Sequence, residues 1–282
     1  MKILENHLIK NFSTMKIGGI CRKIYFPENA NDIVEIKKTE VDPLILGQLS
    51  NVLITDDYFE RAVVILQENF SKIYFKDEYI FAESGATMNG LSNFALENSI
   101  KNFEFMEGIP GSIGGGIFMN AGAYGGEFKD VVKYVTVLRD EKILNVDISE
   151  CDFGKRHSVF QDTGDIILGA AFFAEKGNYD EIKSLVDDLH QRRADKQPLE
   201  YPSCGSVFKR PEGYYASKLI DDLNLKGTRV GGAMVSPKHA GFIINYDNAK
   251  FSDVIELIKL IQKTVKDKEG VDLETELKII EK

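Results

Sequence analysis

The sequence predicts an α+β protein with a large N-terminal domain and a smaller C-terminal domain of α/β type. Short runs rich in β-branched and aromatic residues alternate with turns over the first part of the chain, and few helical patterns interrupt them. Residues 191–202 then form a polar, charged segment that contains two prolines, a composition typical of a linker between domains. We therefore expect one domain at residues 1–195 and a second at residues 196–282.

The first domain is expected to be mostly extended, with helices at residues 31–39 and 88–98. Runs of β-branched and aromatic residues predict its strands, at residues 24–26, 44–46, 52–55, 62–66, 72–75, 79–82, 131–138, 142–146 and 166–173. Asn178 and Glu181 have the spacing of a capping box, which predicts that a further helix begins there.

The second domain is expected to contain one long helix between two strands. Four aliphatic residues fall on one face of a helix at residues 252–269: Val254, Ile258, Ile261 and Val265. Gly270 then provides a favourable C-cap for this helix. We expect the flanking strands at residues 241–246 and 276–281.

The charge and composition exclude several classes of protein. A net charge of −9 argues against a nucleic-acid partner, because binding to the phosphate backbone needs a basic surface. No apolar stretch approaches the roughly 20 residues that cross a bilayer, and the N-terminal residues lack the apolar core of a secretory signal. We therefore expect a cytoplasmic protein without a membrane partner.

Cysteine and histidine usage predicts neither a disulfide framework nor a metal site. Cys21, Cys151 and Cys204 are odd in number and far apart in the sequence. The four histidines never fall at the spacing of metal ligands. We expect no bound metal.

Residues 108–126 hold 8 of the 24 glycines of the chain. Such a segment loses much backbone entropy on folding, and a ligand that needs bare N–H groups, above all a phosphate or pyrophosphate, would offset that loss. We expect the triplet Gly114–Gly116 to lead into a helix. Tight packing between elements is the alternative explanation. Neither a Rossmann glycine fingerprint nor a P-loop is present.

A second turn of small residues spans residues 47–51, between two short apolar runs that are expected to be strands. Two such turns, each at the end of a strand, suggest that one extended ligand is bound from two sides.

Three polar residues are candidates for chemistry. Ser206 follows Gly205 just after the predicted linker, where a plain turn residue is the commoner interpretation. Arg156 lies in a short basic run, which by itself indicates a solvated patch. Glu276 opens the last predicted strand; a carboxylate on its inward face would need a partner, although the spacing alone favours a structural role.

Ser206 and Lys209 also match the S-x-x-K motif of acylating serine enzymes. The match is weak, because the accompanying S-D-N and K-T-G motifs are absent from the sequence.

Six segments, in order and spacing, resemble the UDP-N-acetylenolpyruvoylglucosamine reductase family. They are FSTMKIGG (12–19), LGQLSNVLITD (46–56), GIPGSIGGGIFMNAGAYGG (108–126), FGKRHSVF (153–160), YPSCGSVFKRP (201–211) and KHAGFIINYDNA (238–249). The resemblance runs nearly end to end. The short connection at residues 207–238 is similar to that of the smaller subclass, which lacks an extra loop over the substrate.

The resemblance implies a vanillyl-alcohol-oxidase-type (PCMH-type) FAD-binding domain with subdomains at about residues 1–72 and 73–195, and a C-terminal substrate domain. It implies noncovalent FAD that is reduced by NADPH and then reduces UDP-N-acetylglucosamine enolpyruvate to UDP-N-acetylmuramate, in peptidoglycan synthesis. It also leads us to expect a monomer.

The resemblance also implies roles for individual residues. Ser206 would be the proton donor, and Arg156 and Glu276 would stabilise the enolic intermediate and bind the carboxylate end of the substrate. Lys209 and His239 would face the substrate. The FAD pyrophosphate would lie against two turns, one with Gly47, Ser50 and Asn51 and the other with Gly111, Ser112, Gly114 and Gly115.

The chain departs from the family pattern at Gln48–Leu49, where glycine is usual, and at Lys155, where tyrosine is common. Three alternatives stay open at this point. They are another flavin oxidoreductase on the same FAD fold, an acylating serine hydrolase built on Ser206 and Lys209, and a non-catalytic nucleotide-binding module.

Overall fold

A computed structural model describes residues 1–281 and divides the chain into two compact units. Unit 1 comprises residues Met1–Leu4, Lys23–Gln48 and Arg61–Arg193, and unit 2 comprises Glu5–Arg22, Leu49–Glu60 and Ala194–Lys282. Each unit is therefore assembled from three separate stretches of chain, and the boundaries fall within strands and turns as well as within a helix.

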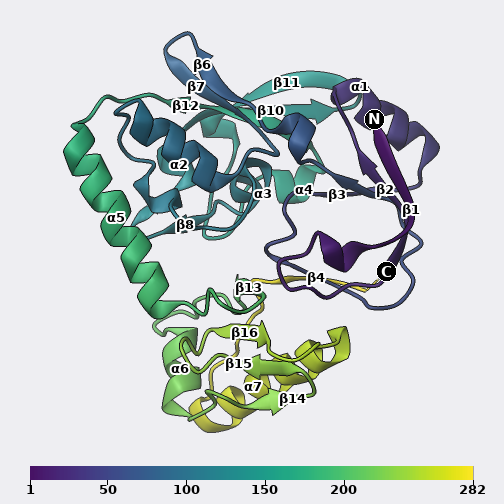
Figure 1. Cartoon of the computed structure of the whole chain (residues 1–282), viewed down its shortest axis with the longest axis vertical. Coiled ribbons are helices and arrows are strands. Elements are labelled where there is room, and N and C mark those ends of the chain that lie inside the picture. The colour runs from purple at the N-terminus through teal and green to yellow at the C-terminus, as the bar shows by residue number, and fades with distance from the viewer. Residues whose placement is uncertain (282) are drawn as a thin grey trace. The chain divides into compact units, whose positions relative to one another are not determined.

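Unit 1 is built around two sheets (Figure 1). The larger sheet has the order β11-β10-β12-β7-β6, and its strands are β11 (Lys142–Asp147), β10 (Val132–Arg139), β12 (Ile166–Phe173), β7 (Tyr79–Glu83) and β6 (Ile73–Lys76). All neighbours in it are antiparallel.

The smaller sheet of unit 1 has the order β1-β2-β5-β3. Its strands are β1 (Lys2–Leu8), β2 (Ile20–Phe26), β5 (Val63–Ile65) and β3 (Leu44–Leu46), and β5 is parallel to both of its neighbours. The division between the units falls within β1 and β2.

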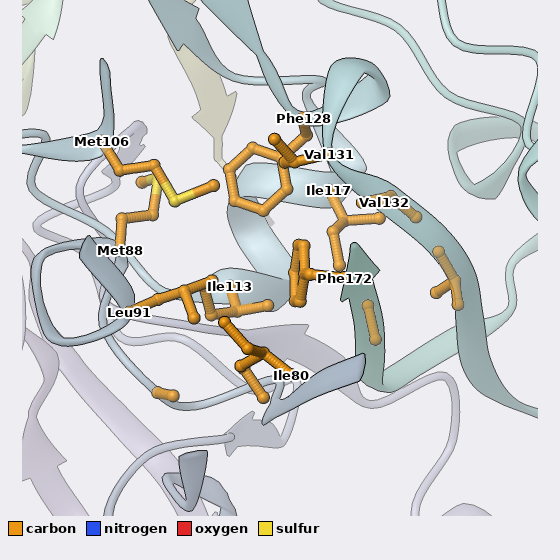
Figure 2. Packing of buried hydrophobic residues seen from close by; sticks show 14 of the residues in the cluster. Ile80, Met88, Leu91, Met106, Ile113, Ile117, Phe128, Val131, Val132 and Phe172 are labelled. Atoms are coloured by element: carbon orange, nitrogen blue, oxygen red, sulfur yellow. The ribbon is translucent and has the colours of Figure 1, made fainter. Parts of the chain in front are cut away.

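The helices of unit 1 are α1 (Ala30–Thr39), α2 (Met88–Glu97), α3 (Ile113–Phe118), α4 (Phe160–Thr163) and α5 (Tyr179–Lys196). Helix α3 packs against β12 and β7. Figure 2 shows Ile113 and Ile117 of α3 within the main core, close to Phe128, Phe172 and Ile80. The apolar face of α3 thus fixes the glycine segment to the large sheet.

Unit 2 contains a sheet of order β13-β16-β15-β14, with β13 (Ser203–Ser206), β16 (Phe242–Asn245), β15 (Ala233–Val235) and β14 (Arg229–Val230). Helix α7 (Phe251–Glu269) packs against β14, β15 and α6 (Ala216–Asp222). A separate parallel pair joins β17 (Lys278–Ile280) to β4 (Val52–Ile54).

The predicted α+β class is confirmed, and the helices expected at residues 31–39, 88–98 and 252–269 are present within one residue at each end. Asn178 caps α5 as predicted, because its Oδ1 accepts from the N–H of Glu181 at 3.2 Å. Helix α5 continues to Lys196, so the first half of the predicted linker is helical.

Two local predictions are wrong. Helix α3 begins at Ile113, so the glycine triplet lies inside the helix rather than before it. Strand β17 begins at Lys278, and Glu276 precedes it instead of opening it.

Among residues 1–281, no helix combines the length and the apolar composition that crossing a bilayer requires.

Candidate active site

The glycine segment of unit 1 is organised by Ser112, the N-cap of α3. Its Oγ accepts from the N–H of Gly115 at 3.4 Å, and its carbonyl oxygen accepts from the N–H of Gly116 at 2.8 Å. Gly111, just before it, has a φ of +146°, which a residue with a side chain adopts only under strain. Glycine and serine are therefore both needed for the sharp entry into this helix.

The glycines inside α3 differ in what surrounds them. A Cβ on Gly114 would lie 2.9 Å from Cβ of Ser84, and a Cβ on Gly116 would lie 2.5 Å from Cε2 of Phe128. A Cβ on Gly115 would meet only Oγ of Ser112, at 3.5 Å, and Gly115 is exposed. Tight packing thus explains why positions 114 and 116 are glycine. It does not explain why position 115 is glycine.

Gly47, which opens the turn at residues 47–51, also lies in unit 1 and is next to Ser112. A Cβ on Gly47 would lie 2.1 Å from Oγ of Ser112, so a side chain there is sterically excluded. The carbonyl oxygen of Gly47 accepts from Nε2 of Gln67 at 3.1 Å, which holds the end of β3 in position. The two turns predicted from the sequence to share a ligand therefore meet at Gly47 and Ser112.

Ser84 provides a further polar atom beside these glycines. Its carbonyl oxygen accepts from the N–H of Gly114 at 2.8 Å. Its Oγ is buried and has no hydrogen-bond partner within residues 1–281. A buried hydroxyl without a partner in the protein is available to a bound polar group. The sequence carried no signal that singled out Ser84.

Residues 49–51 of the turn at residues 47–51 belong to unit 2. Leu49 is 2% exposed and has a φ of +49°, so this departure from the glycine-rich pattern is accommodated by a leucine in the left-handed region. Asn51 donates from Nδ2 to the carbonyl oxygen of Glu276 at 3.2 Å, and its own carbonyl oxygen accepts from the N–H of Lys278 at 3.0 Å. This turn is therefore bonded to the segment that carries Glu276.

Unit 2 also places Ser206 beside Glu276. Ser206 ends β13 and is exposed, and Gly205 before it has a φ of +72°. The N–H of Glu276 donates to the carbonyl oxygen of Val207 at 2.8 Å. Two residues separated by about 70 positions in the sequence thus lie on directly paired backbone segments.

Lys209 and Lys278 add positive charge near these two residues. Lys209 pairs through Nζ with Glu274 at 3.1 Å. Burial, and secondarily the neighbouring charge of Lys209, lowers the pKa of Lys278. Lys278 was not among the predicted site residues, although its two-residue spacing from Glu276 was a signal that it lies nearby.

His239 has a defined orientation in unit 2. Its Nδ1 accepts from the N–H of Gly241 at 3.1 Å, and its ring lies edge-on to Phe242 with 4.8 Å between ring centroids. Burial lowers the pKa of His239. The imidazole is therefore neutral near pH 7, with its proton on Nε2. Phe242 is the register partner of Ser206, so His239 lies close to that strand pair.

Arg156 lies in unit 1 on a tight turn. Its φ is +57°, and its guanidinium donates from Nη1 to the carbonyl oxygen of Asn120 at 3.4 Å and from Nη2 to that of Gly122 at 3.1 Å. Its own carbonyl oxygen accepts from Nε2 of Gln161 at 3.0 Å. These bonds hold Arg156 in place, unlike a solvated basic patch, while the preceding Lys155 is exposed.

Each unit thus presents its own set of groups. Unit 1 provides a bare-backbone turn at Gly47, Ser112 and Gly115 together with the anchored cation Arg156. Unit 2 provides the hydroxyl of Ser206, the carboxylate of Glu276, the neutral imidazole of His239 and two lysines. The groups of unit 1 suit a phosphate-bearing ligand and an anion, and those of unit 2 suit proton transfer and substrate binding.

Two family models match the chain. The model of an FAD binding domain matches residues 23–146, and the model of the UDP-N-acetylenolpyruvoylglucosamine reductase C-terminal domain matches residues 197–280.

The chain is also similar to individual members of one family over almost its whole length. It is 46% identical to the UDP-N-acetylenolpyruvoylglucosamine reductase of Limosilactobacillus reuteri, over 99% of this chain and 95% of that protein. It is 43% identical to the enzyme of the same name from Clostridium novyi, over 99% of this chain and 92% of that protein. The crystal structure of UDP-N-acetylenolpyruvylglucosamine reductase from Thermus caldophilus matches with a TM-score of 0.86 and 29% identity, over 99% of this chain and 98% of that one.

Proposed function

The chain belongs to the UDP-N-acetylenolpyruvoylglucosamine reductase family, and we propose that it reduces UDP-N-acetylglucosamine enolpyruvate to UDP-N-acetylmuramate with FAD and NADPH. It is an FAD-dependent oxidoreductase of peptidoglycan precursor synthesis. The observation that carries this proposal is the 46% identity over 99% of the chain, because a likeness of that extent covers the cofactor and substrate regions together.

The residues present fit FAD. We assign the pyrophosphate to Gly47 and Gly115, whose lack of a side chain permits close approach to the backbone, and to Gly111, Ser112 and Gly114 at the start of α3. We also assign Ser50 and Asn51, which follow Gly47 in the sequence, to binding of FAD. Bound FAD supplies the two-electron chemistry that connects oxidation of NADPH to reduction of the substrate double bond.

We assign the steps on the substrate to individual residues. Arg156 presents a planar guanidinium to the substrate carboxylate and so balances the charge that grows when the enolic intermediate forms. Glu276 stabilises the same intermediate. Ser206 transfers the proton of its hydroxyl to the substrate carbon, and because its side chain is exposed, solvent can return that proton. Lys209 and the Nε2–H of His239 contact the polar part of the substrate.

The role of Ser206 is tested by measuring the two half-reactions separately by stopped flow. Ser206→Ala should leave flavin reduction by NADPH near the wild-type rate, because that step needs no proton at a substrate carbon. Reoxidation by the enolpyruvyl nucleotide should slow by about 10² to 10⁴, the usual contribution of a positioned general acid. Ser206→Cys should recover part of the rate.

Ser203→Ala, at the other end of the same strand, is the matched control and should change neither half-reaction. The assignment fails if Ser206→Ala reoxidises at the wild-type rate, or if both half-reactions slow equally. An acylating serine hydrolase would instead show no dependence on NADPH.

We also propose that the protein is a monomer and that it lies in the cytoplasm. The proposed location is supported by the substrates assigned above, which are nucleotides.

A further inference from the structure

Asn120 follows α3 and is fully buried. Its side-chain polar atoms form three hydrogen bonds within unit 1. Nδ2 donates to Oε2 of Glu127 at 2.5 Å and to the carbonyl oxygen of Gly154 at 2.9 Å, and Oδ1 accepts from the N–H of Lys129 at 3.0 Å. Buried networks satisfied to this degree hold their members in a single arrangement.

A helix end alone does not account for these bonds. Asn120 has a φ of +40°, and asparagine is one of the residues that tolerate the left-handed region after a helix. That preference explains the backbone conformation, but glycine would serve equally well there. It does not explain why the side chain reaches across to Gly154, which lies 34 residues further along the chain.

The segment held in this way is the one that carries Arg156. Gly154 and His157 bond to each other across the turn, through Gly154 N–H to His157 oxygen at 3.1 Å. Asn120 therefore contacts the turn of Arg156 twice, through its side chain at Gly154 and through its carbonyl oxygen at Nη1 of Arg156.

We propose that Asn120 is a positioning residue for Arg156: it fixes the turn at Gly154 and accepts from the guanidinium, so that Arg156 is preorganised for the carboxylate of the substrate. This inference rests on the role of Arg156 in the proposed function. Preorganisation is valuable here because a misplacement of about 1 Å at a reacting group can cost about 100-fold in rate.

Asn120→Asp is the most direct test, because it keeps the size of the side chain and its tolerance of a positive φ. The substitution replaces the donor amide by an oxygen that faces Oε2 of Glu127 and the carbonyl oxygen of Gly154, so both bonds are lost. We expect unchanged FAD content, flavin reduction by NADPH near the wild-type rate, and reoxidation by the enolpyruvyl nucleotide slower by about 10-fold to 100-fold.

The double variant separates positioning from a general structural role. If Asn120 acts through Arg156, Asn120→Asp should slow reoxidation in the wild-type background and hardly at all in the Arg156→Lys background. A structural role would instead give additive effects on the logarithm of the rate.

Asn102→Asp is the matched control. Asn102 also lies in unit 1 with a positive φ, of +78°, and donates from Nδ2 to Oε2 of Glu175 at 3.2 Å. The Asn102 side chain is exposed and bonds to Glu175 instead of the turn of Arg156, so its substitution should leave both half-reactions unchanged.

If Asn120→Asp does not fold, Asn120→Gly removes the same bonds without burying a carboxylate and gives the same readout. Normal reoxidation in a folded Asn120 variant would overturn the inference, as would additivity with Arg156→Lys. Normal reoxidation in Arg156→Lys itself would instead overturn the role proposed for Arg156.

Discussion

Gly115 and Gly116 are neighbours in α3, yet a side chain at each would meet different surroundings. At Gly115 the nearest atom lies 3.5 Å from a Cβ, whereas at Gly116 it lies 2.5 Å away, in the ring of Phe128. Only glycine fits at the second position without a shift of the core. At the first position a side chain would instead occupy the space that we assign to the pyrophosphate.

We predict that Gly115→Val purifies folded but depleted in FAD, because its side chain blocks close approach to the backbone. Gly115→Ala should leave the stability of the apoprotein unchanged or raise it by up to about 1 kcal/mol, the preference of a helix for alanine over glycine. Flavin absorbance per protein and thermal unfolding of the apoprotein measure the two effects.

Gly116→Ala is the control and should lower stability through the clash with Phe128. A Gly115→Val protein with full flavin content would remove Gly115 from the cofactor site.

His239 gives the stability a pH dependence of known sign. Burial lowers its pKa in the folded state, so the unfolded chain binds a proton more readily. The stability contributed by the neutral ring is complete above the unfolded pKa of about 6.5 and is lost as the pH falls through the lower folded value.

We therefore predict that His239→Gln loses less stability than the wild type between about pH 7.5 and pH 5, as measured by thermal unfolding across that range. His7→Gln is the control, because the His7 side chain lies against the amide of Asn11 and the ring of Phe12, which are both uncharged. Parallel curves for wild type and His239→Gln would show that this ring does not contribute to the acid sensitivity.

At the scale of elements, the sequence predicted best those features that local chemistry determines. Asn178 caps its helix through its own side chain, and the stripe from Val254 to Val265 buries one face of α7. The glycine triplet was misplaced because a helix through three glycines contradicts local propensity and exists only because Ile113 and Ile117 are buried. Tertiary packing, and not local propensity, therefore determines where α3 begins.

The candidate site was predicted only in part, for the same reason. Residue types indicated a turn at residues 47–51 and a glycine segment at residues 108–126. The resemblance to the family singled out Gly47 and Ser112 within them, and the structure brings these two residues into contact. The pairing of Glu276 with the segment after Ser206 depends on long-range backbone bonds that leave no local pattern. Ser84 and Asn120 have ordinary sequence surroundings, and only their burial and bonds distinguish them.

The antiparallel pair of β10 and β12 is closed at one end by a salt bridge. Arg139 donates from Nε and Nη2 to the two carboxylate oxygens of Asp165, at 2.8 and 2.6 Å. The Asp165 side chain is 2% exposed and that of Arg139 is 42% exposed. Hydrogen bonds from Arg139 hold the pKa of Asp165 below its usual value.

We predict that Asp165→Asn lowers the free energy of unfolding by about 1–3 kcal/mol at neutral pH, less than for a fully buried pair because the guanidinium is partly in water. The stability that this carboxylate contributes is present above about pH 4 and is lost as the pH falls through its lowered folded pKa. Urea unfolding at neutral and acidic pH should therefore show that the difference in free energy of unfolding between wild type and Asp165→Asn becomes smaller in acid.

Asp42→Asn removes an exposed ion pair with Arg61 and should change stability by less than about 1 kcal/mol. A similar loss in both variants would mean that burial of Asp165 is not what makes its salt bridge stabilising.

At the scale of the whole molecule, the two units differ in how their cores are assembled. The core of unit 2 includes Met15, Ile17 and Leu53, which come from the N-terminal part of the chain, together with residues 204–277. Strand β17 also pairs with β4, which lies in the same N-terminal part. Both cores of unit 1, by contrast, lie between Tyr25 and Phe172.

We therefore predict that a fragment of residues 1–193, which contains all of unit 1, folds by itself, whereas a fragment of residues 194–282 does not. The second fragment lacks three fully or nearly buried side chains of its own core, and each large aliphatic side chain removed from a core costs about 2–5 kcal/mol, against a total stability of about 5–15 kcal/mol. It also leaves β17 without its partner strand.

Circular dichroism and thermal unfolding of the two fragments measure whether each one unfolds cooperatively. Fusing residues 5–22 and 49–60 to the second fragment through flexible linkers should restore a cooperative transition. Cooperative unfolding of the unfused fragment would show that the N-terminal segments only cover a core that residues 194–282 form alone.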